Sequence, residues 1–190
     1  IAADAGRGGG IRLDGSSGAI NVRLSVAEIV SLWLAARLSR HASDLPWSAE
    51  ARSALNRLLA SLPRAKAAEL RQLCQRVFVG PEASPEVRLT ATAPASELLR
   101  RFEEAFSRRL GLAIAYTDAT GRRTERRVEP HGLLVQPPVW YLLARDVDKR
   151  AARMFRLDRI GASRVAASIH FRPDPAIIRV QVPPGCEPLA

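Results

Sequence analysis

Apolar residues in the first part of the chain recur at the spacing of a helix that buries one face. The pattern predicts a helix over 25–40, which Ser25 and Glu28 would open as a capping box. A second helix is expected from Ser48, and a third after Pro63, a residue that suits the first position of a helix. The apolar positions of the first helix are Val26, Ile29, Val30, Trp33, Leu34 and Leu38.

A break and a fourth helix follow these elements. Residues 77–79 are typical of a strand end, and the Gly- and Pro-containing stretch 80–85 predicts a linker. Helical spacing returns over 95–110, where Gly111 is expected to end the helix in the position after its cap.

After Gly111 the apolar period changes from 3.6 to 2, which indicates strands. Turn sequences separate them at 118–121, at Pro137-Pro138 and at 148–150. Short strands at this spacing favour a small barrel or a half-open sheet. One more strand is expected in the tail, at 177–182. The strands before the tail are expected at 112–116, 122–129, 132–136, 139–146 and 153–157.

Charge adds a candidate chemistry to this α+β picture. The chain has 190 residues and a formal net charge of +10, and Lys66 and Lys149 are its only lysines. Between Gly121 and Arg164, eleven Lys and Arg stand against five Asp and Glu, a net charge of +6. The guanidinium fork binds planar anions such as phosphate and carboxylate. The cluster therefore indicates an anion or nucleic-acid site, with a solvated basic surface as the alternative.

The order of motifs in the strand region resembles the WYL domain of bacterial transcriptional regulators. Tyr116 precedes a turn, a basic strand and an apolar strand, and then Trp140-Tyr141-Leu142 and the stretch 155–160, Phe-Arg-Leu-Asp-Arg-Ile, follow. The resemblance covers roughly residues 110–165. It implies an Sm-like, SH3-type β-barrel that senses nucleic-acid-derived or other anionic effectors, single-stranded DNA among them, in regulators that are often homodimeric.

The resemblance also divides the chain. Residues 1–20 are interpreted as the remnant of a winged-helix wing and a linker, and 21–80 as a helical linker or dimerisation segment. Residues 94–165 would be the WYL domain with its leading helix, and 166–190 a C-terminal tail. A winged helix-turn-helix that binds operator DNA is not expected within this sequence.

Three arginines match basic positions of the family. Arg126, Arg156 and Arg159 would converge on one barrel face and bind phosphate oxygens by charge-assisted hydrogen bonds. The alternative is that they form structural ion pairs with Glu125, Glu129 and Asp158.

Four further residues are candidates for the ligand site. Tyr116 could stack on a base, and His131 could donate to an anion or respond to pH. Tyr141 and Arg145 share one face of their strand and could reach a ligand. Trp140 and Leu142, on the opposite face, are expected to belong to the barrel core. For each candidate the alternative is a structural role.

The function expected from these features is ligand sensing by the regulatory region of a transcriptional regulator. The alternatives are a direct RNA- or single-stranded-DNA-binding module and a dimerisation module without a ligand. We expect no enzyme activity, cofactor or metal, because no catalytic constellation or metal-ligand spacing is present, and Cys74 and Cys186 read as two reduced thiols. The chain has no apolar run long enough for a membrane span, and a cytoplasmic location is expected.

Overall fold

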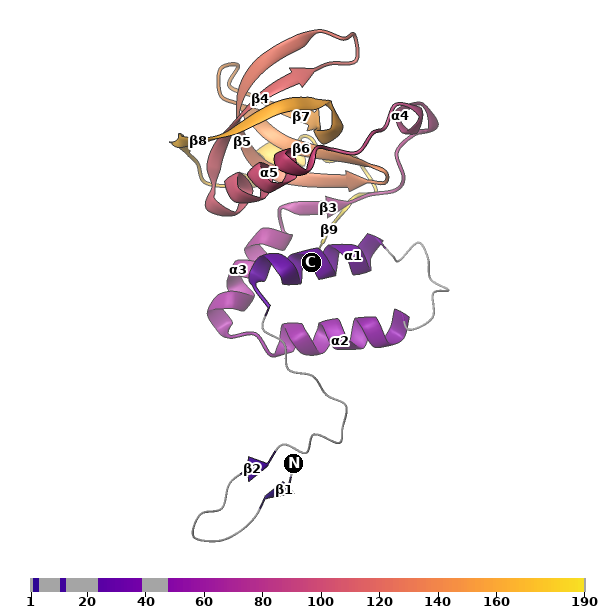
Figure 1. The fold of residues 1–190 in the computed structure, drawn as a ribbon, viewed down its shortest axis with the longest axis vertical. Helices are drawn as coiled ribbons and strands as arrows, with labels where there is room; N and C mark the ends of the chain where they lie inside the picture. Colours follow the sequence, from indigo (N-terminus) through magenta and orange to yellow (C-terminus); the bar gives the residue numbers. More distant parts are fainter. Residues whose placement is uncertain (1, 4–10, 13–23, 39–47, 190) are drawn as a thin grey trace.

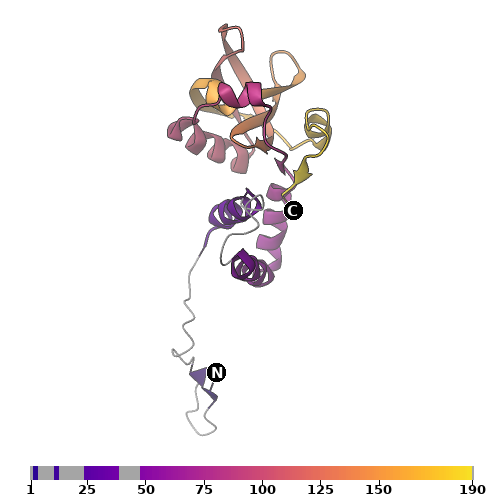
Figure 2. The ribbon, with the colours of Figure 1, turned by 90° about the vertical axis from the view of Figure 1, so that its right-hand side faces the viewer.

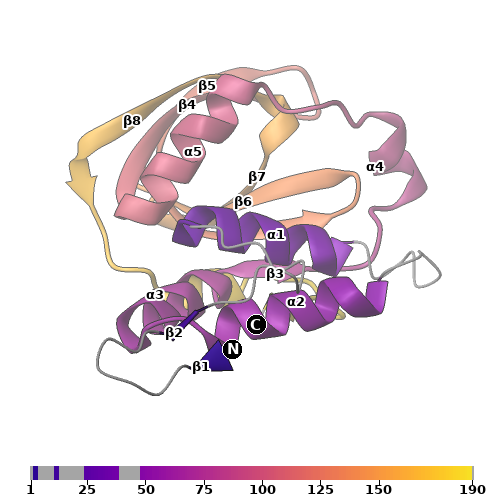
Figure 3. The same ribbon diagram turned by 60° about the horizontal axis from the view of Figure 1, so that its bottom comes forward.

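The computed structural model describes residues 2–3, 11–12, 24–38 and 48–189. Three helices gather below a curved sheet, and the last of them leads directly into it (Figures 1–3). A short antiparallel pair, β1 (Ala2–Ala3) and β2 (Ile11–Arg12), stands apart from them. The interpretation of residues 1–20 as a wing remnant and linker lies largely outside the described residues.

The first three helices form where the apolar spacing predicted them. They are α1 (Val26–Leu38), α2 (Ser48–Ala60) and α3 (Arg64–Cys74). The capping box is confirmed, because the Ser25 N–H donates to the Glu28 carboxylate at 2.6 Å and the Glu28 N–H donates to the Ser25 hydroxyl at 3.3 Å. Pro63 is not the first helical residue as expected but precedes it at the N-cap.

Seven strands form one sheet around the long strand β5. β7, β6 and β5 are successive antiparallel neighbours. The first part of β5 pairs with β4, whose other neighbour is β8, and its last part pairs in parallel with β3, which β9 borders. The strands are β3 (Val77–Val79), β4 (Leu110–Thr117), β5 (Arg123–Gln136), β6 (Val139–Asp146), β7 (Ala151–Arg156), β8 (Ile160–His170) and β9 (Glu187–Pro188).

β5 is one strand where the sequence predicted two. Its register with β6 shifts between Pro130 and Gly132, so the strand bends there without ending. The buried Arg76 side chain supports this bend: it donates to the carbonyl of Pro130 at 2.7 Å and to that of His131 at 2.8 Å. A third bond, to the carbonyl of Phe106, is 3.0 Å long. Nothing in the local sequence pattern showed that an arginine 55 residues away would satisfy these carbonyls.

The Sm-like, SH3-type barrel that the resemblance implies is not confirmed, because the sheet is not closed; the half-open sheet was the alternative. Among the described residues β7 and β8 are not paired with each other, although they follow one another in the chain. The 3₁₀ turn η3 (Leu157–Arg159) carries the chain from β7 across to β4, where Tyr116 pairs with Ile160. β8 itself was not expected as a strand, since its sequence lacks a sustained apolar alternation.

Helix α5 (Ser96–Arg108) packs across the sheet with Leu98, Phe102 and Phe106 buried. It does not end through Gly111 as expected. Arg109 adopts the left-handed conformation, with φ of 58°, at the helix end. Gly111 instead lies inside β4, where a Cβ would stand 2.6 Å from the Cβ of Ile169.

Two short helices occupy stretches predicted otherwise. α4 (Pro85–Leu89) forms at the end of the expected linker. The prediction of a strand at 177–182 is wrong, because helix α6 (Pro175–Arg179) covers the first part of that stretch. The Asp174 carboxylate accepts the N–H of Ala176 at 2.8 Å and so caps this helix.

The helices and the concave face of the sheet share one hydrophobic core. Ile29 of α1 and Leu70 of α3 belong to the same buried cluster as Leu112 and Leu142 of the sheet. A second cluster, on the other side, joins Ile178 of α6 to Leu134 and Leu143. None of the helices in the described ranges has both the length and the apolar character that crossing a membrane requires.

Candidate anion-binding site

Four of the predicted site residues lie close together where β7 passes into η3. Tyr141 of β6 is the cross-strand partner of Arg156, and Tyr116 of β4 pairs with Ile160, the residue after Arg159. Burial raises the pKa of Tyr141, and the positive charges of Arg156 and Arg159 oppose that rise. We call Tyr116, Tyr141 and Arg159, with the Arg156–Asp158 pair behind them, the tyrosine–arginine cluster.

Arg156 is held in place by protein groups. Its Nε donates to Asp158 Oδ1 at 3.0 Å and its Nη2 to Oδ2 at 2.6 Å, a bidentate ion pair. Nη1 and Nη2 also donate to the hydroxyl and the carbonyl of Thr90, both at 3.0 Å. The side chains of Arg156 and Asp158 are only 7% and 4% exposed. This geometry matches the alternative interpretation of Arg156 as a structural residue.

Asp158 orients that arginine and also holds the segment before α5. Its Oδ2 accepts the N–H of Thr92 at 3.1 Å. Burial alone would raise the pKa of Asp158, but the hydrogen bonds from Arg156 and from the Thr92 N–H lower it below its ordinary value of 3.8. The positive charges of Arg156 and Arg159 lower it further, so Asp158 is a carboxylate that is hydrogen-bonded to Arg156 and only electrostatically attracted to the next arginine, Arg159.

That next arginine, Arg159, has no hydrogen bond or ion pair within the described part of the chain and is half-buried. The ring of Tyr116 stands edge-on to Phe155, with ring centroids 5.0 Å apart, which fixes its orientation. The hydroxyl groups of Tyr116 and Tyr141 likewise have no protein partner among the described residues. Tyr116 packs against the core of the concave face, and Tyr141 packs against the second cluster on the other side of the sheet. The donors available to an anion near this turn are therefore the Arg159 guanidinium and one tyrosine hydroxyl on each side.

Arg126 lies on the concave face, with Ile114 as its partner on β4. Its Nη1 is 3.4 Å from Oδ2 of Asp146, a carboxylate with no exposed surface, and its own side chain is 23% exposed. Arg153 of β7 approaches the same carboxylate oxygen at 3.9 Å. Because two guanidiniums share one carboxylate, this group keeps a net positive charge. We call Arg126, Arg153 and Asp146 the shared-carboxylate group.

His131 and Arg145 belong to a third group, centred on Glu129. His131 is 2% exposed; its Nε2 lies 3.2 Å from Glu129 Oε2, and its Nδ1 accepts the N–H of Asp174 at 2.9 Å. Arg145 Nε is 3.5 Å from the same Glu129 oxygen. Burial lowers the pKa of His131, in spite of the opposing effect of Glu129. Both ring nitrogens of His131 are thus engaged with the protein.

The structure distributes the three predicted arginines over two groups, and does not bring all three to one pocket. Arg156 and Arg159 share the tyrosine–arginine cluster, and Arg126 is in the shared-carboxylate group, near Tyr116 on the same face of the sheet. Sequence reasoning missed Arg153, although its alternation with Phe155 places it on the concave face. It also missed Thr90, whose contact with Arg156 spans 66 residues.

Other chemistries have little support among the described residues. No group of three or more His, Cys, Asp or Glu there could hold a metal ion. Cys74 and Cys186 are free thiols, and burial raises the pKa of Cys74 to about 11.

Comparison with known proteins assigns the strand region. Residues 97–165 match the WYL domain, so a WYL domain is present in this chain. A segment of 39 residues is 49% identical to the protein PafB of Mycobacterium leprae and 51% identical to PafB of Mycobacterium tuberculosis. Each match covers 20% of this chain and 12% of the relative, so the chain matches only a small part of the curated relatives.

A solved structure is also similar to this chain. It is the proteasome accessory factor B/C (PafBC) of Arthrobacter aurescens, with 27% sequence identity and a TM-score of 0.40. The similarity covers 80% of this chain and 20% of that chain.

Proposed function

We propose that this WYL-domain chain is the ligand-sensing regulatory region of a transcriptional regulator, and that its effector is a nucleotide or a short single-stranded nucleic acid. The WYL domain at residues 97–165 and the similarity to PafB support the regulatory part of this proposal. The geometry around β7 and η3 supports the nature of the effector.

One observation carries the proposal: Arg159 stands without a hydrogen bond or ion pair in the described structure, while the arginine three residues before it is fully engaged. A half-buried guanidinium is incompletely hydrated and has no protein acceptor, so an anion gains charge-assisted hydrogen bonds there at small desolvation cost. The hydroxyl groups of Tyr116 and Tyr141 supply two further donors.

The shared-carboxylate group extends this site along the concave face. Arg126 is a diagonal neighbour of Tyr116 across β4 and β5, since Tyr116 pairs with Thr124 and Ile114 with Arg126. Tyr116 therefore lies between the two positively charged groups. A ligand with two phosphates would place one at Arg159 and the other at Arg126, with a base against the Tyr116 ring.

The direct test is the binding of a fluorescein-labelled five-nucleotide thymidylate strand, followed by fluorescence anisotropy at several salt concentrations. Two or three phosphate contacts on a single strand give a slope of about −2 in log K against log salt. Arg159→Gln should weaken binding about tenfold, because it removes one charge-assisted contact, and should make the slope shallower by about 0.7.

The matched control is Arg172→Gln, which removes the same charge from an exposed position on the C-terminal segment. It should change affinity by less than about twofold, since screened surface charges contribute little. Equal losses for Arg159→Gln and Arg172→Gln would mean that binding follows net charge alone. No binding at low salt would favour the dimerisation module, and binding with no effect on DNA recognition would favour the direct nucleic-acid module.

The regulatory step needs a longer protein. In the proposal the chain acts as a homodimer in the cytoplasm, and a winged helix-turn-helix recognises the operator. The effector changes operator affinity only if it binds two arrangements of the dimer with different affinity. The test is operator binding by the full-length regulator with and without the oligonucleotide, in the wild type and in Arg159→Gln.

A further inference from the structure

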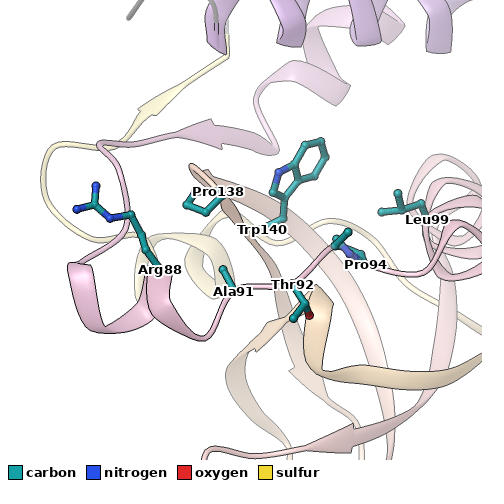
Figure 4. A pocket seen from close by; sticks show the side chains of 8 residues that line it. Arg88, Ala91, Thr92, Pro94, Leu99, Pro138 and Trp140 are labelled. Carbon is teal, nitrogen blue, oxygen red and sulfur yellow. The ribbon is translucent and has the colours of Figure 1, made fainter.

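A cleft lies between the segment that precedes α5 and the hairpin that joins β5 to β6. Its volume is about 440 Å³, within the range of small-molecule sites. No residue of the tyrosine–arginine cluster or of the shared-carboxylate group lines it. Figure 4 shows its lining: Arg88, Ala91, Thr92, Ala93, Pro94, Leu99, Pro138 and Trp140.

The walls of the cleft are apolar, and its main feature is the indole of Trp140. In Figure 4 the indole stands between Pro138 on one side and Pro94 and Leu99 on the other. Trp140 packs against the main core cluster, as expected, but it remains half-buried, whereas Leu142, two residues further on the same strand face, is fully buried. An accessible indole flanked by prolines offers stacking surface to a flat ring.

The polar side-chain groups beside the indole can only donate. The indole N–H has no hydrogen-bond partner within the described residues, and Figure 4 places the ring nitrogen on the side of Pro138. Arg88 stands at the end of the cleft beyond Pro138, and in this view its guanidinium points away from the indole. Thr92 is turned away from the indole in the same view. The donors at this end of the cleft, the indole N–H and the Arg88 guanidinium, select a ligand that carries acceptors or a negative charge and that can compete with Glu82 for Arg88.

Arg88 is available for such a ligand. It pairs with Glu82, but the two side chains are 42% and 62% exposed. Exposed ion pairs of this kind contribute little to stability. Arg88 can therefore exchange Glu82 for a ligand carboxylate at small cost, and the bidentate geometry suits its guanidinium.

We propose that this cleft is a second ligand site, and that it takes a planar aromatic ring carrying one carboxylate or similar monoanionic group. The ring lies against Trp140 between Pro138 and Pro94, and the anionic group meets Arg88. The two proposed sites share no lining residue, although the Thr92 N–H of this cleft donates to Asp158 of the tyrosine–arginine cluster.

The experiment uses two probes of the same shape: indole-3-carboxylate and its neutral analogue indole-3-carboxamide. Nitrogen-15 correlation spectra of the chain give one indole N–H signal for each of its three tryptophans, and Trp140→Phe assigns that of Trp140. Titration with the carboxylate should shift the Trp140 signal in a saturable way and leave the signals of the other two tryptophans unchanged.

Variants separate the two halves of the proposed contact. Arg88→Gln should weaken the carboxylate about tenfold and leave the carboxamide unchanged, because it removes only the charge-assisted bond. Ala93→Phe, which fills the cleft and keeps Trp140 in place, should abolish the shift for both probes. Arg159→Gln is the control from the proposed effector site and should change neither affinity.

Three results would overturn the proposal. The first is an unchanged Trp140 signal at millimolar probe with a folded chain. The second is equal affinity for the carboxylate in the wild type and in Arg88→Gln. The third is loss of the shift in Arg159→Gln, which would place the aromatic acid in the effector site. The nucleotide titration tests the effector site separately, so failure of one proposal leaves the other standing.

Discussion

Replacing Arg156 by leucine should destabilise the chain strongly, although the sequence presents this arginine as a ligand contact. The substitution leaves the carboxylate of Asp158, 4% exposed, without its cation and removes two hydrogen bonds to Thr90. Removing one partner of a buried ion pair costs about 3–5 kcal/mol. Because Asp158 keeps the N–H of Thr92, we expect the lower end, about 3 kcal/mol of unfolding free energy.

Urea denaturation followed by circular dichroism measures this value, and a double-mutant cycle tests its cause. Arg156→Leu combined with Asp158→Leu should cost only about 1–2 kcal/mol, since no unpaired buried charge remains. Arg159→Leu is the matched control from the same turn, and without a protein partner it should cost less than about 0.5 kcal/mol.

The pH dependence gives a second reading of the same pair. The pKa of Asp158 is lowered in the folded chain, so the pair contributes stability above the ordinary value of 3.8 and loses it as pH falls through the lower folded-state pKa. The advantage of the wild type over the double variant should therefore shrink below about pH 4. Equal losses for Arg156→Leu and Arg159→Leu, or unchanged stability with weakened oligonucleotide binding in Arg156→Leu, would refute the structural role.

Three other predictions concern the frame of the site. Arg76→Met leaves three buried carbonyl groups without their donor, so urea denaturation should show a loss of about 2 kcal/mol in the free energy of unfolding. This value is the cost of the lost hydrogen bonds reduced by the gain from no longer burying a charge. Gly111→Ala should lower the free energy of unfolding by about 1–3 kcal/mol, because the added methyl group overpacks against Ile169. Adding Ile169→Ala to that variant should restore part of the lost stability, and the absence of any restoration would exclude this contact as the cause. Burial lowers the pKa of His131, so its contribution to stability is complete above the ordinary value of 6.5 and declines as the pH falls below that value. Thermal denaturation between pH 8 and pH 5 measures this decline. The decline should be smaller in His131→Asn, and an unchanged pH profile in that variant would contradict the assignment.

Local patterns predicted most of the elements. β6 (Val139–Asp146) has the bounds that apolar alternation indicated, and the capping box opens α1 as expected. The turn before β5 also forms as predicted: the Asp118 carboxylate accepts the backbone N–H groups of Thr120 and Arg122, and Gly121 takes a φ of 83°. In each case the residues that decide the conformation are close neighbours in the sequence.

The errors have two physical sources. The first source is a competition between two short-range signals. The apolar residues at 177–182 suggested a strand, but helix α6 forms instead, because Asp174 is an N-cap and Pro175 suits the first helical position. The second is contact between residues far apart in the sequence. Two contacts show this: Arg156 donates to Thr90, and Arg126 shares the carboxylate of Asp146 with Arg153. Both contacts depend on how the chain folds over long sequence distances, which the sequence pattern does not reveal. The composition of the site could be predicted, but its partition into groups could not.

The strand β3 has a mechanical consequence for any signal that passes through this chain. Only two residues, 75 and 76, separate it from the end of α3. Both of its edges are held, since it lies between β5 and β9, and the N–H of Leu189 donates to the carbonyl of Val77 at 2.8 Å. A strand that is paired along both edges moves with its sheet, so a ligand that tilts the sheet would carry β3, and with it the end of α3, in the same direction. Any rotation of α3 relative to the sheet is confined to residues 75 and 76, because separating β3 itself would require breaking a backbone ladder.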